Sequence, residues 1–239
     1  MSRIDNNTGQ LTNSTYKFLG KVHIPRQETN MILDWIMRPT DDNENICLLI
    51  GTAGQGKTVV LHDLTEQLKG MKDGRYHAFG VKADMLDFEA FRNHDEQSNY
   101  EGEMVQLKKN GITPVLIIDQ IDTLSKSLST DRKPITQLDA LIGMAMRAGA
   151  KVVVSCRPYD LNYDPVLKKY KHRRKIGLGN LTLEQVNYVL KECEKSEVNA
   201  DSRMYKFLST PVHLEYFIEY GRDGSEDVSL KTLMDQMWM

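Results

Sequence analysis

A single glycine-rich stretch constrains the fold of this 239-residue chain more than any other feature. It reads Gly51-Thr52-Ala53-Gly54-Gln55-Gly56-Lys57-Thr58 and matches the pattern G-x-x-x-x-G-K-[S/T] without a mismatch. The run Ile46–Ile50 before it is continuously apolar, as expected of a parallel strand buried on both faces. Apolar residues recur after it at helical spacing, up to Gly70. The sequence therefore predicts a strand, a glycine loop and a helix in that order.

This order gives the glycine loop a specific chemistry. Glycines let backbone N–H groups approach phosphate oxygens, and the N-terminus of the following helix adds partial positive charge. Lys57 would then reach the β and γ phosphates of a nucleotide, and the Thr58 hydroxyl would ligate Mg²⁺. The alternative is a glycine turn that only joins a strand to a helix, and the flanking pattern disfavours it.

The composition excludes several classes of protein. The 31 basic and 33 acidic residues leave a formal charge of −2, which gives no reason to expect a nucleic-acid binder. The cysteines Cys47, Cys156 and Cys193 lack metal-ligand spacing, and we expect buried free thiols. No apolar stretch reaches the length of a membrane span, and the N-terminus has no signal-peptide pattern. We therefore expect a cytoplasmic protein that does not enter a membrane.

A second apolar run ends in a carboxylate. Pro114–Ile118 has the length and composition of a buried strand, and Asp119 follows directly. In phosphate-loop NTPases an aspartate at such a position holds Mg²⁺ opposite the glycine loop. Asp119 is therefore the predicted metal ligand. The alternative is an aspartate that caps a helix N-terminus, but the upstream glycine loop favours the metal.

Strands and helices alternate along most of the chain. Further short apolar runs predict strands at 78–81, 152–154 and 176–178. This alternation predicts an α/β fold, a P-loop NTPase with a parallel sheet covered by helices on both faces, followed by a small helical subdomain. Ligands of such sheets bind beyond the carboxyl ends of the strands. Thr58, Asp119 and Arg157 lie just past strand ends or in the adjoining loop and helix, so we expect them to converge on one site.

The chain divides into three predicted parts. Residues 1–20 are polar and indicate a flexible N-terminal arm, 21–180 form the nucleotide-binding core, and 181–239 form the helical subdomain. Thr182 and Gln185 have the spacing of a capping box at a helix start. The last apolar stretch, from Leu230, runs to Met239 without a polar tail, which suggests a piece of a longer protein.

With these landmarks in place, the sequence resembles the STAND class of P-loop NTPases, relatives of AAA+ proteins that include NACHT and NB-ARC domains. The resemblance covers about residues 20–239 and rests, besides the glycine loop, on segments at 23–28, 116–122, 154–158, 178–182 and 208–214. It implies a domain that binds ATP or ADP with Mg²⁺ and hydrolyses ATP slowly. ATP would hold an active, oligomeric state and ADP a closed one. The resemblance also implies sensor and effector domains elsewhere in the protein, and a role in sensing or defence signalling.

The residue after Asp119 separates two groups of relatives. Many AAA+ ATPases have a glutamate there as the base that activates the attacking water, and Gln120 cannot take this role. In NACHT-like domains the acidic residue lies three positions after the metal-binding aspartate, and Asp122 matches that position. The resemblance thus makes Asp122 the candidate water-activating residue. The alternative is a surface carboxylate at a helix start.

The resemblance assigns roles to further residues. The guanidinium of Arg157 would pair with the γ-phosphate and report whether ATP or ADP is bound, the alternative being a surface salt bridge. The catalytic set is then Lys57, Asp119, Asp122 and Arg157. The adenine and ribose would be flanked by Ile24, Pro25, Arg26, Pro211 and His213. A histidine beside a proline often has only a structural role, and Ser209 stands where the family often has glycine.

The basic run Lys168–Lys175 allows a rival interpretation. It could bind nucleic acid or supply an arginine to a neighbouring protomer, as in an AAA+ or initiator-like ATPase acting on nucleic acid or protein. Charge runs are usually solvated, and Tyr170 is the only aromatic residue within this one, so nucleic acid is not the favoured partner. A module that uses ATP only as a structural ligand is a further alternative. The expected partners are a nucleotide and further copies of the chain.

Overall fold

The computed structural model of the chain describes residues 17–39, 44–84, 94–125 and 130–221. They form two compact units. The first contains the described residues of 26–51 and 57–177, and the second contains those of 15–25, 52–56 and 178–239. Most of the predicted N-terminal arm and the apolar stretch from Leu230 lie outside the described residues.

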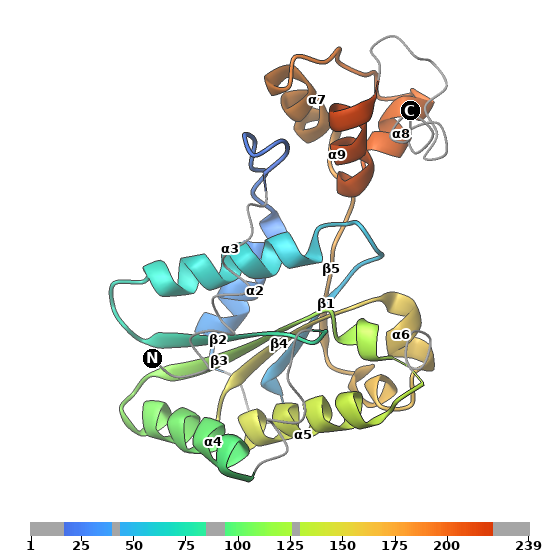
Figure 1. The fold of residues 1–239 in the computed structure, drawn as a ribbon. Helices are drawn as coiled ribbons and strands as arrows, with labels where there is room; N and C mark the ends of the chain where they lie inside the picture. The colour runs from blue at the N-terminus through green and yellow to red at the C-terminus, as the bar shows by residue number, and fades with distance from the viewer. Residues whose placement is uncertain (1–16, 40–43, 85–93, 126–129, 222–239) are drawn as a thin grey trace. The chain divides into compact units, whose positions relative to one another are not determined.

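Five parallel strands form the sheet of the first unit (Figure 1). They are β1 (Ile46–Ile50), β2 (Tyr76–Lys82), β3 (Thr113–Asp119), β4 (Lys151–Cys156) and β5 (Arg174–Gly177), in the order β2-β3-β4-β1-β5. The central strands are almost continuously apolar, as a sheet covered on both faces requires. The predicted fold class is confirmed.

Helices cover both faces of this sheet (Figure 1). α2 (Gln27–Met37) and α3 (Lys57–Gly70) lie on one face, and α4 (His94–Lys109) and α5 (Lys133–Arg147) lie on the other. Short segments complete the unit after β3 and β4: η3 (Ile121–Leu124), α6 (Pro158–Tyr163) and η4 (Leu167–Tyr170). The sequence pattern did not predict these short segments, because a helix of one or two turns carries too few residues to establish a period.

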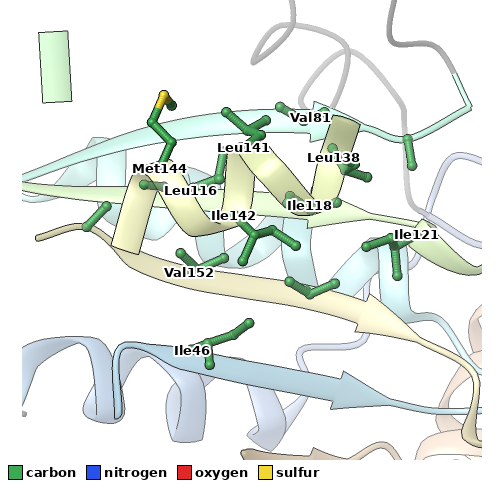
Figure 2. Close-up of a cluster of buried hydrophobic side chains, with 14 of the residues drawn as sticks. Ile46, Val81, Leu116, Ile118, Ile121, Leu138, Leu141, Ile142, Met144 and Val152 are labelled. Atoms are coloured by element: carbon green, nitrogen blue, oxygen red, sulfur yellow. The ribbon is translucent and has the colours of Figure 1, made fainter. Parts of the chain in front are cut away.

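The apolar side of α5 explains how a helix attaches to the sheet. Figure 2 shows Leu138, Leu141 and Ile142 of this helix directed at Leu116 and Ile118 of β3. The three helical residues recur at the spacing of one helix face, and they are almost fully buried. Burial of one such side chain contributes roughly 1.5–3 kcal/mol, so this face holds the helix in place.

The order of the strands positions the candidate site. β4 lies between β1 and β3, and all three strands are parallel. Their carboxyl ends therefore share one edge of the sheet. Gly51, Asp119 and Arg157 lie at or just beyond these ends, where parallel sheets bind ligands.

Within its described residues, the second unit contains three helices. These are α7 (Leu183–Glu192), α8 (Arg203–Leu208) and α9 (Pro211–Tyr220). Thr182 and Gln185 form the predicted capping box, in which each side chain accepts a hydrogen bond from the backbone N–H of the other residue. The helices share a core with the segment before the first unit, to which Val22 and Ile24 contribute. Its bounds differ from the predicted ones, because residues 21–25 and 52–56, which the sequence analysis placed in the core, belong to this unit. The division into a core and a helical subdomain stays a prediction.

Two further predictions concern the whole chain. In the parts of the chain that the structure describes, no helix combines the length and the apolarity that a membrane crossing requires. Cys47 and Cys156 are buried free thiols, as predicted, whereas Cys193 is only partly buried.

Candidate nucleotide-binding site

The glycine loop leads from β1 directly into α3, as the sequence predicted. β1 ends at Ile50 and α3 begins at Lys57. Gly54 and Gly56 between them have φ angles of 77° and 88°, in the left-handed region that residues with a side chain rarely adopt. These glycines allow the sharp path from strand to helix that brings backbone N–H groups close to a phosphate.

Lys57 is held against the start of the loop. Its Nζ donates a hydrogen bond to the Gly51 carbonyl oxygen at 2.8 Å. Burial lowers the pKa of the Lys57 ammonium, while the carboxylates of Asp122 and Asp119 act in the opposite direction. A partly desolvated ammonium at the start of α3 is well placed to pair with phosphate oxygens. These anionic oxygens would balance the positive charge of Lys57 better than the neutral carbonyl oxygen of Gly51 does.

Thr58 and Asp119 form the candidate metal site. The Thr58 hydroxyl donates to Asp119 Oδ2 at 2.7 Å, and Asp119 is fully buried at the end of β3. The two side chains thus present a hydroxyl and a carboxylate oxygen at one point. This donor set fits Mg²⁺, which proteins usually bind through one or two side chains while phosphate oxygens and waters complete the octahedron.

Ser155 positions the Asp119 carboxylate, a role that the sequence analysis missed. Its hydroxyl donates to Asp119 Oδ1 at 2.7 Å and accepts from the Gln120 backbone N–H at 2.8 Å. Ser155 is fully buried in β4, the neighbour of β3. The available signal was a hydroxyl residue inside an apolar strand, since a buried polar group requires a partner.

We expect Ser155→Ala to raise the Mg²⁺ concentration at which nucleotide binding is half-maximal. Loss of the hydroxyl frees the Asp119 carboxylate to rotate, and removal of such a supporting hydrogen bond typically costs about 10-fold to 100-fold in metal affinity. Titration of nucleotide binding with Mg²⁺ measures the effect. Val153→Ala, which removes apolar volume from the same strand, should lower stability and leave the Mg²⁺ midpoint unchanged. An unchanged midpoint in Ser155→Ala would contradict the positioning role.

Asp122 and Arg157 form an ion pair beside Lys57. Arg157 Nε lies 2.6 Å from Asp122 Oδ2. Asp122 is 3% exposed, and its Oδ1 is buried without a hydrogen-bond partner among the described residues. Burial raises the pKa of the Asp122 carboxyl, and the charges of Lys57 and Arg157 oppose that shift. An ionised carboxylate oxygen with no partner is the group that a general base requires.

A left-handed residue turns the chain after β3. Gln120 has φ 58° and ψ 40°, and its carbonyl oxygen accepts hydrogen bonds from both the backbone N–H and the hydroxyl of Thr123. This tight turn starts η3 and directs Asp122 back toward Lys57, rather than onto the surface that the alternative interpretation required. Left-handed backbone costs an L-residue about 1–2 kcal/mol, which indicates that the turn is held by its surroundings.

The central residues of the glycine loop belong to the helical unit. The Gly54 carbonyl oxygen accepts from the backbone N–H of Val212 at 3.2 Å. The Gln55 side chain accepts from the Thr52 N–H at 2.6 Å and donates to Asn180 at 3.0 Å. Asn180 in turn donates to the Ser209 hydroxyl at 3.2 Å. Sequence reasoning did not single out Val212 or Asn180, because both contacts join residues more than a hundred positions apart.

The five residues predicted to flank the base and ribose lie in different surroundings. Pro25 is exposed, Ile24 is buried in the core of the helical unit, and buried Arg26 pairs with Glu28 at 3.4 Å. Pro211 lies close to Gly56, because a Cβ added to this glycine would be 3.9 Å from Pro211 Cγ.

The ring of His213, the remaining member of this set, stacks on Phe207 with 4.3 Å between centroids. Its Nδ1 lies 3.0 Å from the Phe207 carbonyl oxygen. These contacts give His213 a structural role within the helical unit. Its predicted place beside the nucleotide remains a prediction.

Comparison with known protein families agrees with this geometry. The profile of the ATPase family associated with various cellular activities (AAA) matches residues 47–178, from the first strand to the end of the fifth. The chain belongs to the AAA family. Membership makes this chain a nucleotide-binding ATPase, and the matched region contains the glycine loop, Asp119, Asp122 and Arg157.

Solved structures of other ATPases share the fold of this AAA domain. The structure of Aeropyrum pernix ORC1 in complex with DNA superposes with a TM-score of 0.56 at 14% identity, over 90% of this chain and 65% of the other. DnaA from Aquifex aeolicus, bound to AMPPCP, has a TM-score of 0.55 at 16% identity over 94% and 70%. The S. cerevisiae Hsp104-ADP complex has a TM-score of 0.55 at 15% identity over 82% of this chain and 30% of its own. No curated protein matches the sequence. At these identities the likeness concerns the fold alone.

We expect Gly54→Ala to damage the loop of this AAA domain. An added Cβ would clash with Val212 Cγ1, and the positive φ costs an alanine about 1–2 kcal/mol by itself. Nucleotide affinity and the melting temperature should therefore both fall. Gly70→Ala is the matched control, because Gly70 ends α3 with open space around it and a negative φ. Equal behaviour of the two variants would show that the contact between Gly54 and Val212 does not constrain the loop.

Proposed function

We propose that this AAA domain is a nucleotide switch of the STAND type. It binds ATP with Mg²⁺ and hydrolyses it slowly, so that ATP favours an active, oligomeric state and ADP a closed one. The observation that carries the proposal is the hydrogen bonding of Gly54 and Gln55 to Val212 and Asn180. A phosphate that rearranges the glycine loop must also act on the helical unit through these bonds.

The ion pair between Arg157 and Asp122 supplies the sensing element of the proposal. In this structure the guanidinium of Arg157 is paired with the Asp122 carboxylate, with 2.6 Å between Nε and Oδ2. A γ-phosphate offers Arg157 a bidentate partner of higher charge, which ADP lacks. Exchange of one partner for the other would release the Asp122 carboxylate for the attacking water only when ATP is bound. Such a difference in affinity between two states is what a ligand needs to move a conformational equilibrium.

The remaining roles follow from the chemistry of the side chains. Lys57 pairs with the β and γ phosphates, Thr58 and Asp119 hold Mg²⁺, and Asp122 accepts the proton of the attacking water. Mg²⁺, when bound, neutralises the charge of the phosphates. Gln120 in the position after the metal-binding aspartate supports slow turnover, because it cannot act as a second base. The adenine contacts proposed for Ile24, Pro25, Arg26, Pro211 and His213 belong to the same hypothesis, as do sensor and effector domains elsewhere in the protein.

Hydrogen exchange in α9 tests the switch. Peptides that cover Pro211–Tyr220 should differ in exchange between the ATP-bound and ADP-bound protein, while peptides from α5 should not, because local opening reports on each element separately. The purified protein should also retain ADP. Identical exchange in α9 with both nucleotides, measured at saturation, would refute the switch and leave nucleotide binding intact.

A second candidate function is an AAA+ or initiator-like ATPase that acts on nucleic acid or protein. The exposed basic residues between 168 and 175 favour it. This function predicts rapid multiple turnover that a nucleic acid or a protein substrate stimulates. Turnover measured with and without single-stranded DNA separates the two candidates. A slow switch would hydrolyse ATP at the same low rate in both cases.

A further inference from the structure

The segment from α6 to η4 has a buried side and an exposed side. Leu161, Leu167 and Tyr170 are buried in the core of the first unit. On the other side Tyr159 and Tyr163 are 60% and 69% exposed, and the centroids of their rings lie 4.7 Å apart. Two large aromatic side chains thus stand in solvent one helical turn apart. Packing within the described residues does not account for their size.

The acidic side chains of this segment are withdrawn from its surface. Asp160 is 2% exposed and accepts a hydrogen bond from the Ser125 hydroxyl at 2.6 Å. Asp164 is 3% exposed and forms an ion pair with Arg132 at 2.8 Å. They are the only acidic residues between 158 and 177. The solvent-facing charge of the segment is therefore entirely basic.

Four exposed cations follow the tyrosine pair. They are Lys168, Lys171, Arg174 and Lys175. Among the described residues, no acidic side chain forms an ion pair with any of the four. Lys169 differs, because it pairs with Asp139 and lies over the ring of Tyr170. The four cations are thus available to an external anion.

We propose that the surface formed by α6 and η4, defined by Tyr159, Tyr163, Lys168 and Lys171, binds single-stranded nucleic acid. Bases would stack on the exposed tyrosine rings, and the backbone phosphates would pair with the two lysine side chains, since η4 packs against α6 and the backbone N–H of Lys168 donates to the Asp164 carbonyl oxygen at 2.9 Å. The combination of aromatic platforms with a basic track is what sequence-tolerant single-strand binding requires. The proposal is independent of the proposed switch, since none of these residues belongs to the nucleotide-binding machinery described above.

The tyrosine pair favours a single strand over two other polyanions. A duplex keeps its bases stacked inside the helix, so it would bind through the cations without stacking on the tyrosine rings. An acidic protein would likewise need the cations alone. A third explanation is that the tyrosines, four positions apart, only stabilise the short helix α6 through their mutual contact. Each explanation predicts a different response to removal of the rings.

Fluorescence anisotropy of a labelled oligothymidylate, about 20 nucleotides long, tests the proposal. We expect saturable binding that weakens with salt, with a log–log slope of about −1 to −2, because each of about two phosphate contacts on a single strand contributes about −0.7. Tyr159→Ala and Tyr163→Ala should each lower the affinity about 5-fold to 100-fold, the usual effect of losing one stacking platform. Tyr163→Phe should retain binding, because the ring persists. An oligouridylate arm distinguishes RNA from DNA as the preferred strand.

Matched variants exclude trivial causes. Tyr188→Ala removes a tyrosine that is 51% exposed on α7, and Lys191→Glu reverses an exposed charge on the same helix; neither should change oligonucleotide binding. Lys171→Glu should weaken it, and melting temperatures identify any variant that fails to fold. Affinity for ATP should stay at the wild-type value throughout. The proposal is overturned if the tyrosine variants bind oligothymidylate as the wild type does, if duplex binds as tightly as single strand, or if polyglutamate competes equally well.

Discussion

Lys57→Ala is expected to abolish nucleotide binding at concentrations that saturate the wild type. The ammonium is the strongest single phosphate ligand in the glycine loop, and loss of charge-assisted hydrogen bonds to two phosphates should lower the affinity by about 100-fold or more. Isothermal titration with ATP and with ADP measures the effect. Because the switch and its rivals all use this contact, the result tests the site itself.

The variant should fold normally. Burial lowers the pKa of Lys57, which means that the folded protein holds the charged ammonium less favourably than the unfolded chain does. Its removal therefore should not lower the free energy of unfolding at neutral pH. Lys69→Ala is the matched control, because Lys69 lies on the same helix, is exposed and pairs only at the surface with Glu66. Wild-type affinity in Lys57→Ala would overturn the assignment of the loop as a phosphate site.

Asp122→Asn is expected to stop hydrolysis and to leave ATP binding in place. The amide keeps the shape of the side chain and cannot accept a proton, and loss of a general base typically costs about 10²-fold to 10⁴-fold in rate. Single-turnover hydrolysis, with ATP affinity measured in parallel, separates the two effects. Asp73→Asn removes an exposed carboxylate from another surface and should change neither. Wild-type hydrolysis in Asp122→Asn would mean that another group activates the water.

The pH dependence of hydrolysis gives an independent test of Asp122. Its carboxyl must be ionised to act as a base, and burial raises its pKa. The rate should therefore fall as the pH decreases through this raised pKa, on an acid limb that lies above the ordinary range of aspartate. The raised pKa also means that ionised Asp122 does not stabilise the fold at neutral pH, so any activity lost on the acid limb should return when the pH is restored. A rate that does not change across this range would contradict the role of Asp122 as the base.

Much of the fold followed from local patterns. β1 spans the residues that the apolar run marked, and the capping box of α7 is formed by the two residues that its spacing indicated. Asp119 terminates β3, as predicted. These features depend on neighbours within a few positions, such as a strand next to a glycine loop or a hydroxyl three residues before an amide. Such information is fully present in a linear sequence.

Contacts between distant segments could not be predicted in this way. Ser155 supports Asp119 because β3 and β4 are adjacent in the sheet, and Val212 contacts Gly54 because both residues belong to the helical unit. The same limit applies to the surface formed by Tyr159 and Tyr163: their exposure, and the burial of the two aspartates beside them, depend on which side of α6 packs inward.

The sequence by itself determined that this chain binds a nucleotide, because the loop from Gly51 to Thr58 needs only its own backbone and the flanking strand and helix to form a phosphate site. Only the tertiary structure decided what surrounds that site. Asp122 faces Arg157 because a left-handed turn at Gln120 directs it inward, and Gly54 and Gln55 form hydrogen bonds within the helical unit to residues more than a hundred positions away. The physical reason is that these contacts are made by packing, which brings together residues whose separation in the sequence carries no signal.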